Sequence, residues 1–386
     1  LSLPLSCNPK PAPYDASSLA SAAMSALSEE SYRAYVAELS SDDFLGRKPF
    51  TKGDTLTVQY IEKQFKALGL APGNGDSYFQ EVPMVQIDAK PTNTTWTFSG
   101  PKGQVNAKYL DDFVISTPQM NEKVQVADSE LVFVGFGIVA PEFDWNDYAG
   151  VDVKGKTVVA MVSDPGRYDK NLFKADTMTY YGRWNYKYEE AARQGAAGVI
   201  LIHETAAASY GWNVVRSGWS GPQLSLVPEA DAKNVQFQSW ITTPVANQLF
   251  AISEVNDSIM EEAKKPGFKA RAMGIKTGVD LQSKIRKSAS NNVVAQLKGT
   301  KRPDEVVIYT AHWDHLGVGE AVDGDSIFNG AIDNAAGVSA LFEIAKAFQA
   351  AKVKPERTIV FMAVTAEEEG LLGSQYYTEH PIFPIN

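Results

Sequence analysis

The stretches EVVIYTAHWDH (305–315), IDNAAGVSALFEIAKAFQA (332–350) and RTIVFMAVTAEEEG (357–370) decide the fold of this chain. The first and third hold continuous apolar runs, and the second repeats apolar residues at helical spacing, which predicts a helix over Asn334–Ala351 between two strands. A strand, a crossover helix and a second strand imply parallel pairing in a sheet that is covered on both faces. We therefore predict an α/β fold with a mixed, largely parallel sheet and helices on both faces.

Polar residues follow the two predicted strands, at the sheet edge where such folds bind ligands. His312 and Asp314 are two residues apart, so their side chains can point the same way and the carboxylate can orient the imidazole toward a metal. Asp333 precedes the helix. Glu367 and Glu368 are neighbours that point differently, so one can bind a metal while the other serves as a general base. Imidazole and carboxylates together suit zinc.

Each of these motifs also has a simpler explanation when it is taken alone. His312-x-Asp314 could be a surface turn, Asp333 could cap the following helix, and residues 367–369 could form a solvated acidic loop at a helix N-terminus. The presence of all three motifs in this order favours a metal site.

Length and composition limit the remaining possibilities. With 386 residues, 44% hydrophobic and 21% charged, the chain is long enough for two globular domains. A net charge of −10 and the lack of any Lys/Arg-rich run argue against nucleic acid as a partner. Apolar runs such as 198–202 are far shorter than the roughly 18 residues that span a bilayer.

The sequence outside these motifs predicts amphipathic helices near the N-terminus and short strands in the middle of the chain. Amphipathic helices are expected over Glu29–Leu39 and Thr55–Leu68, the second with Asp54 as a cap, and a turn-rich link at 41–47 joins them. Short alternating strands begin near residue 90, and a strand–helix–strand pattern precedes a stretch, 204–275, that we expect to be irregular.

Three motifs resemble those of a known family. His312-x-Asp314, GAIDNAAG (330–337) and AEEEGLLGS (366–374) are similar to the two-zinc, or co-catalytic, aminopeptidases of the bacterial leucyl aminopeptidase type, whose relatives include glutamate carboxypeptidase and the transferrin receptor. Residues 131–204 resemble the β-rich α/β protease-associated domain that is inserted in some members, and DFLGR (43–47) also matches such members.

The resemblance implies a zinc exopeptidase fold with an insert. It divides the chain into an N-terminal tether or signal remnant (1–27), the N-terminal part of the peptidase domain (28–105), the protease-associated insert (106–275) and the catalytic peptidase domain (276–386).

The resemblance also implies a role for each site residue. His312 would bind the first zinc, Asp333 would bridge two zinc ions, Glu368 would bind the second, and Asp314 would support His312. Glu367 would be the general base for a metal-bridging hydroxide that hydrolyses peptides with a free N-terminus. The family often has a cis peptide after the bridging Asp, which predicts one at Asp333–Asn334.

Alternatives to the aminopeptidase remain at this stage. A carboxypeptidase of the same fold needs a basic pocket that the sequence does not locate, and a glutaminyl cyclase usually lacks the His-x-Asp motif. A non-catalytic, receptor-like binding protein has lost the metal ligands that this chain keeps.

The family's ligand set is incomplete in this sequence. An Asp after the Glu pair and a His near the C-terminus are missing, and His380 before Pro381 is better explained as a helix end. His315 could be a spare ligand, but beside Asp314 a structural or substrate-facing role is favoured. We therefore expect the chain to be part of a longer protein.

The family resemblance implies export, because bacterial members that carry the insert are commonly exported, and the N-terminus adds a possible lipid anchor. Leu1–Cys7 resembles the end of a signal peptide that meets a lipid-attachment cysteine, which implies a periplasmic protein, an outer-membrane lipoprotein tethered through Cys7, or a secreted protein. Otherwise Cys7 is incidental in an unstructured terminus. It is the only cysteine, so the chain has no intrachain disulfide.

Overall fold

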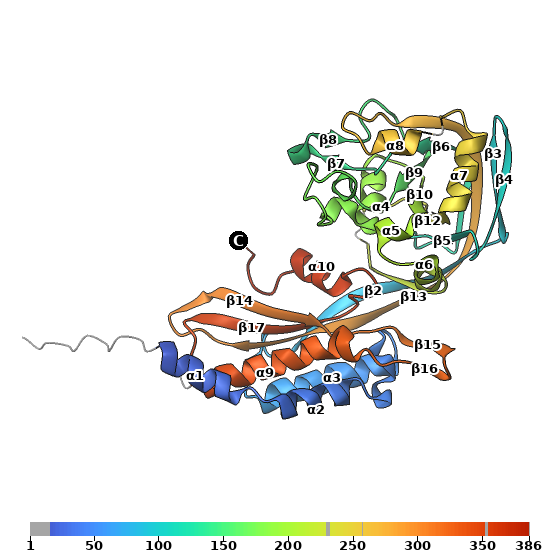
Figure 1. Ribbon diagram of the computed structural model, residues 1–386. Coiled ribbons are helices and arrows are strands. Elements are labelled where there is room, and N and C mark those ends of the chain that lie inside the picture. The colour runs from blue at the N-terminus through green and yellow to red at the C-terminus, as the bar shows by residue number, and fades with distance from the viewer. Residues whose placement is uncertain (1–15, 229–231, 257, 352–353, 386) are drawn as a thin grey trace, which may run out of the picture. The chain divides into compact units, whose positions relative to one another are not determined.

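The computed structural model describes residues 16–228, 232–256, 258–351 and 354–385. The chain forms two compact units, unit 1 (Leu1–Pro83 and Ala289–Asn386) and unit 2 (Met84–Ser288) (Figure 1). Cys7, on which the predicted lipid tether depends, lies outside the described residues.

Unit 1 contains the predicted strand–helix–strand arrangement. β14 (Arg302–His312) and β17 (Arg357–Val364) pair in parallel and are joined by α9 (Ala336–Ala350). β17 also pairs antiparallel with the C-terminal part of β13 (Arg271–Leu297), which makes the sheet mixed. The α/β fold class predicted from the sequence is confirmed.

The crossover helix begins two residues later than predicted. Asp333 and Asn334 lie in the segment η5 (Ala331–Ala335) with non-helical backbone angles, φ −116° and −138°, and the peptide bond between them is cis, as expected. The helical hydrogen bonding of α9 therefore starts only after the motif that contains Asp333.

Helices cover both faces of the sheet of unit 1. α2 (Glu29–Leu39), α3 (Lys52–Ala67) and α9 share one core with the sheet, in which the rings of Phe65 and Phe342 lie 5.6 Å apart. On the other face, Tyr377 of α10 (Leu372–Glu379) packs with alternate residues of β17. The remaining elements of unit 1 are α1 (Ala16–Ala26), η1 (Asp42–Arg47), β1 (Ala71–Pro72), β15 (Gly317–Val322) and β16 (Asp325–Phe328).

The N-terminal boundary of α3 differs from the prediction. Thr51, rather than the predicted Asp54, is the N-cap, and its hydroxyl accepts from the Gly53 N–H at 3.1 Å. Asp54 instead accepts from the backbone N–H of Phe50 at 3.0 Å. The helix therefore begins at Lys52, three residues before the predicted start.

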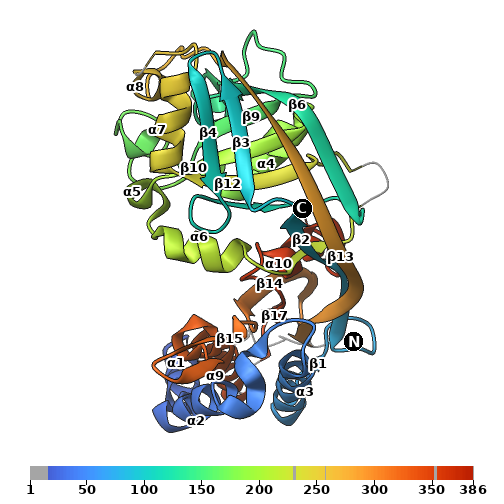
Figure 2. The same cartoon turned by 90° about the vertical axis from the view of Figure 1, so that its right-hand side faces the viewer.

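Unit 2 is built around parallel strands. β6 (Lys123–Phe133), β9 (Thr157–Met161), β10 (Gly198–His203) and β12 (Phe237–Thr242) pair in parallel in this order, and β5 (Phe113–Ser116) pairs antiparallel with β12. The hairpin of β3 (Thr95–Gly100) and β4 (Gly103–Lys108) lies beside β13 (Figure 2). β2 (Phe79–Pro91) begins in unit 1 and continues into unit 2. The remaining elements of unit 2 up to residue 203 are β7 (Val139–Ala140), η2 (Pro141–Phe143), β8 (Trp145–Asn146), η3 (Pro165–Arg167), η4 (Tyr180–Gly182) and α4 (Trp184–Arg193).

The prediction that residues 204–275 are irregular is wrong. They contain, besides β12, the elements α5 (Thr205–Ala208), α6 (Trp212–Trp219), β11 (Gln223–Leu226), α7 (Thr243–Ile252) and α8 (Ile259–Ala263). Pro244 obscured α7, although it lies in the first turn, where the helix does not need its missing N–H.

Unit 2 is wider than the predicted insert 106–275. β3 and β4 join it because β3 pairs with the N-terminal part of β13 as well as with β4. Among the described residues, no helix is both long and apolar enough to cross a membrane.

Candidate metal centre

The parallel register of unit 1 places the predicted site residues at one sheet edge. His312 pairs with Val364, so β14 and β17 end side by side. Asp314 and the pair Glu367 and Glu368 follow these strand ends directly. Between His312 and Asp314, the Trp313 side chain is fully buried, and its Nε1 donates to Asn291 O at 3.0 Å.

His312 lies among carboxylates. Its Nε2 is 3.0 Å from Asp333 Oδ1 and 3.7 Å from Glu367 Oε2. Its Nδ1 lies 3.2 Å from the backbone oxygen of Asp314 and 3.7 Å from Oδ1 of the same residue. The structure thus brings together four of the five predicted residues around one imidazole.

Asp314 also has contacts that the sequence did not predict. Its fully buried carboxylate accepts from the backbone N–H of Glu367 at 3.0 Å and of Glu368 at 3.2 Å. Asp314 therefore fixes the backbone of both glutamates in addition to lying beside His312.

The fifth predicted residue, Glu368, contacts a different histidine. Its Oε1 lies 2.6 Å from Nδ1 of His315. His315, Asp333 and Glu368 each offer one ligand atom, and these three atoms lie within 4.8 Å of one another. Asp333 is thus shared by a group around His312 and a group around His315. His380 lies at the end of α10, where its ring is 4.4 Å from the Tyr376 ring and tilted by 42° to it.

The electrostatics of the site favour positive charge. Burial alone would lower the pKa of His312, but the hydrogen bond and charge of Asp314, together with Glu367 and Asp333, raise this pKa to about 9. Burial raises the pKa of Glu367, and the nearby His312 opposes this effect. The carboxylates that hold a proton on His312 would also attract a divalent cation.

Arg47 of the DFLGR motif holds the two segments of the site together. Its buried guanidinium donates to the backbone oxygens of Trp313 at 2.8 Å, Asn329 at 2.6 Å and Gly330 at 2.8 Å. A fourth bond reaches Leu39 O at 2.6 Å. Burial lowers the pKa of Arg47 to about 10, so it stays charged at neutral pH.

The donor set fits a metal that accepts both nitrogen and oxygen ligands. Two imidazoles and three carboxylates, those of Asp333, Glu367 and Glu368, converge on one sheet edge, and such mixed sets are typical of zinc and related divalent ions.

Comparisons with known proteins find similarity over the segment that contains this site. Residues 292–385 match the model of Peptidase family M28. A probable zinc metalloprotease of Pyricularia oryzae is 36% identical over 118 residues, which cover 31% of this chain and 21% of the relative. A glutamate carboxypeptidase 2 homolog of Caenorhabditis elegans is 32% identical over 118 residues, or 30% of this chain and 14% of the relative. The match thus spans less than a quarter of either relative.

Among solved structures, an aminopeptidase from Aneurinibacillus sp. strain AM-1 superposes with a TM-score of 0.49 and 22% identity, over 93% of this chain and 68% of that one. The sheet edge with its histidines and carboxylates defines a candidate metal centre. Residues 292–385, which contain this centre, are similar to Peptidase family M28.

Proposed function

We propose that the protein is a zinc-dependent aminopeptidase. The observation that carries this proposal is the convergence of His312, Asp333, Glu367 and Glu368 where two parallel strands end. The match to Peptidase family M28 and the relatives named as probable zinc metalloproteases support a hydrolase that acts on peptide bonds.

In this proposal, His312, Asp333 and Glu368 hold the metal, with His315 beside Glu368. Bound zinc supplies Lewis-acid chemistry, which polarises the scissile carbonyl and strengthens water as a nucleophile. Glu367 takes the proton of the attacking water and returns it to the departing amine. The Asp314 carboxylate keeps Glu367 in place by accepting from the backbone N–H of Glu367.

Charge favours cleavage at the N-terminus over cleavage at the C-terminus. The carboxylates around His312 attract the protonated α-amine of a peptide. A carboxypeptidase needs a cation for the terminal carboxylate, but Arg47 donates to four backbone oxygens, and Lys48 Nζ lies 3.4 Å from Glu369 Oε1.

The test combines metal analysis with two substrates. We expect the purified chain to contain zinc and to release the chromophore of a leucyl 4-nitroanilide, and a chelator should abolish this release. Glu367→Gln should keep the metal and lower kcat by about 100- to 10,000-fold. Glu369→Gln, the neighbouring carboxylate that pairs with Lys48, is the matched control and should retain activity.

Two outcomes would contradict the proposal. Release of the C-terminal residue from an N-acetylated peptide, without cleavage of the leucyl substrate, would identify a carboxypeptidase. Bound zinc without cleavage of either substrate would identify a binding protein.

A further inference from the structure

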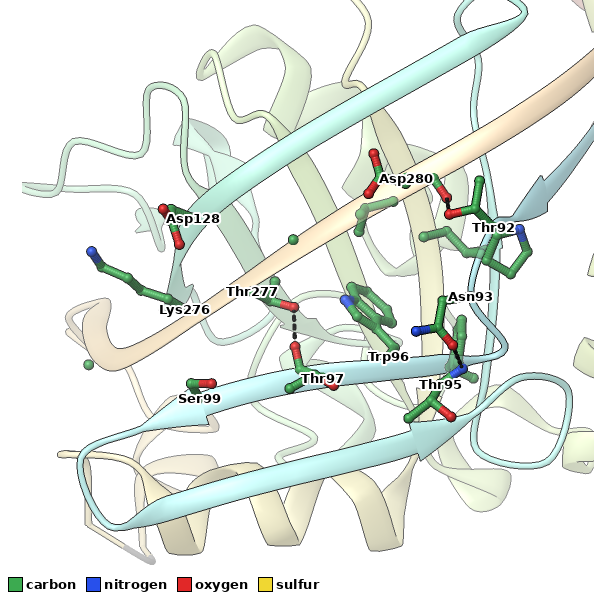
Figure 3. A pocket seen from close by; sticks show the side chains of 16 residues that line it. Thr92, Asn93, Thr95, Trp96, Thr97, Ser99, Asp128, Lys276, Thr277 and Asp280 are labelled. Atoms are coloured by element: carbon green, nitrogen blue, oxygen red, sulfur yellow. Dashed lines mark hydrogen bonds between the residues drawn. The ribbon is translucent and has the colours of Figure 1, made fainter.

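We propose that unit 2 binds a neutral saccharide of one or two rings in a pocket between β3 and β13 (Figure 3). The cavity has a volume of about 540 Å³, within the usual range for small-molecule sites. All its lining residues belong to unit 2, so the inference does not depend on the metal centre.

The pocket exists because two strands separate. β3 and β13 pair only at Ser99 with Lys276 and at Phe98 with Thr277, and a register irregularity in the pairing of β13 with β6 follows directly after Thr277. Figure 3 shows the resulting gap, across which Trp96 lies between the two strands.

Both ends of the gap are closed. At one end the Thr277 hydroxyl donates to Thr97 O at 2.8 Å, and at the other the Thr92 N–H donates to Asp280 O at 3.0 Å. An extended peptide added to the edge of β3 would have to pass through these closures. The gap therefore suits a compact ligand better than a peptide strand.

The floor offers an unused hydrogen-bond donor. Trp96 is 5% exposed, and its ring packs against Phe98, Phe113 and Phe237 with centroids 4.6, 5.1 and 5.8 Å away. Its buried Nε1 has no hydrogen-bond partner among the residues that the structure describes. A buried indole N–H is normally paired, so an acceptor oxygen of a ligand would complete this site.

The rim of the pocket offers hydrogen-bond donors and acceptors, and its side chains carry little positive charge. Asn93 uses its Oδ1 to accept from the Thr95 N–H, which leaves its amide hydrogens to donate outward. Lys276, Asp128 and Asp280 also line the pocket, and two carboxylates against one amine disfavour an anionic ligand. Sugar hydroxyls both donate and accept, and so match this mixed rim.

The test is a glycan array that displays neutral, amino and acidic sugars, probed with the full chain. A retained neutral sugar is then titrated by calorimetry. We expect Trp96→Phe, which keeps an aromatic ring but removes the N–H, to weaken binding about fivefold or more. Trp219→Phe makes the same change outside the pocket and should leave the affinity unchanged.

Thr95→Val tests the rim of the pocket, because it removes the hydroxyl of an exposed residue and nearly keeps the side-chain shape. It should also weaken binding. If Trp96→Phe does not fold, this variant decides the test. Titration of the same sugar, free and linked to a peptide asparagine, then separates a free saccharide from a glycosylated peptide as the source. The proposal is overturned if the array retains no sugar, retains acidic sugars only, or retains neutral sugars that both variants bind as tightly as the wild type.

Discussion

Arg47 and Gly330 are joined by a hydrogen bond of 2.8 Å from Nη2 to the backbone oxygen. The same guanidinium donates to Trp313 O, so one side chain connects the segment of His312 with the segment that leads to Asp333. Gly330 O also accepts from the Ala335 N–H at 3.1 Å, but that bond stays within one segment. The geometry of the candidate metal centre therefore depends on a residue that binds no metal.

Replacement of Arg47 tests this dependence. Arg47→Lys keeps the charge but cannot reproduce the planar fork that reaches four carbonyl oxygens. We expect the free energy of unfolding to fall by roughly 2–4 kcal/mol, because buried carbonyls lose charged donors. Urea unfolding of the metal-free chain measures this change, and zinc affinity should fall with it.

Arg33→Lys is the matched control. Arg33 is exposed and pairs with Glu29 one helical turn away, so the change should alter stability by less than about 0.5 kcal/mol. If Arg47→Lys is equally mild, Arg47 does not organise the site.

Replacement of Gly330 is a second test of how packing holds the candidate metal centre, and it removes no metal ligand. Its φ is +60°, and a Cβ would lie 2.6 Å from Arg47 Nη2 and 2.6 Å from His315 Cδ2. Gly150 has a similar φ of +78° with nothing within 4 Å of a Cβ. Gly150→Ala should therefore show the backbone cost alone, about 1 kcal/mol. We expect Gly330→Ala to lose about 1–3 kcal/mol more in urea unfolding, because it overpacks the site.

Gly330→Ala should also weaken zinc binding at least tenfold, measured by competition with a chromophoric chelator, whereas Gly150→Ala should not. Equal stability and equal zinc affinity in the two variants would mean that the close packing around Gly330 has no role in the site.

Asp314 gives a prediction about the two glutamates. Asp314→Asn leaves one oxygen to accept, and its NH₂ group would face the other backbone N–H, of Glu367 or Glu368. We expect zinc affinity to fall about 10- to 100-fold, as is usual when a residue that orients metal ligands is changed. Asp152→Asn is the control, because Asp152 also accepts from a backbone N–H, that of Lys154 at 2.9 Å, but in unit 2. Unchanged zinc affinity in Asp314→Asn would contradict the orienting role.

The sequence predicted the parts of the molecule that depend on local pattern. β17 and α9 were predictable because continuous apolar runs and helical spacing are visible within about 15 residues. The pairing of β14 with β17 followed from their connection through a helix. His312 was predicted from its place at a strand end and Asp333 from its place before the helix, and the family resemblance implied their roles.

Other contacts depend on long-range packing, which no local pattern contains. The bond from Arg47 to Trp313 joins residues 266 positions apart, and the sequence offered only a motif around Arg47. His315 follows Asp314 directly, yet its ring contacts Glu368, 53 positions away. The presence of a second histidine so close to the first was the one signal that could have indicated this role.

His203 in unit 2 predicts a pH dependence of stability. Burial lowers its pKa, and the hydrogen bond to Tyr210 O at 3.0 Å opposes this only in part. The unfolded chain, with an ordinary pKa of about 6.5, then binds a proton that the folded chain does not. The stability that His203 contributes is therefore complete above about pH 6.5 and is lost as the pH falls toward its lower folded pKa.

Replacement of His203 by Gln removes this titration. Gln can still donate to Tyr210 O but cannot take up a proton. We expect the unfolding free energy of the wild type to fall more steeply between pH 8 and pH 5 than that of His203→Gln, as measured by urea unfolding at each pH. His380→Gln replaces an exposed histidine of unit 1 and should keep the wild-type slope. A wild-type slope in His203→Gln would show that the buried imidazole is protonated as easily in the folded chain as in the unfolded one.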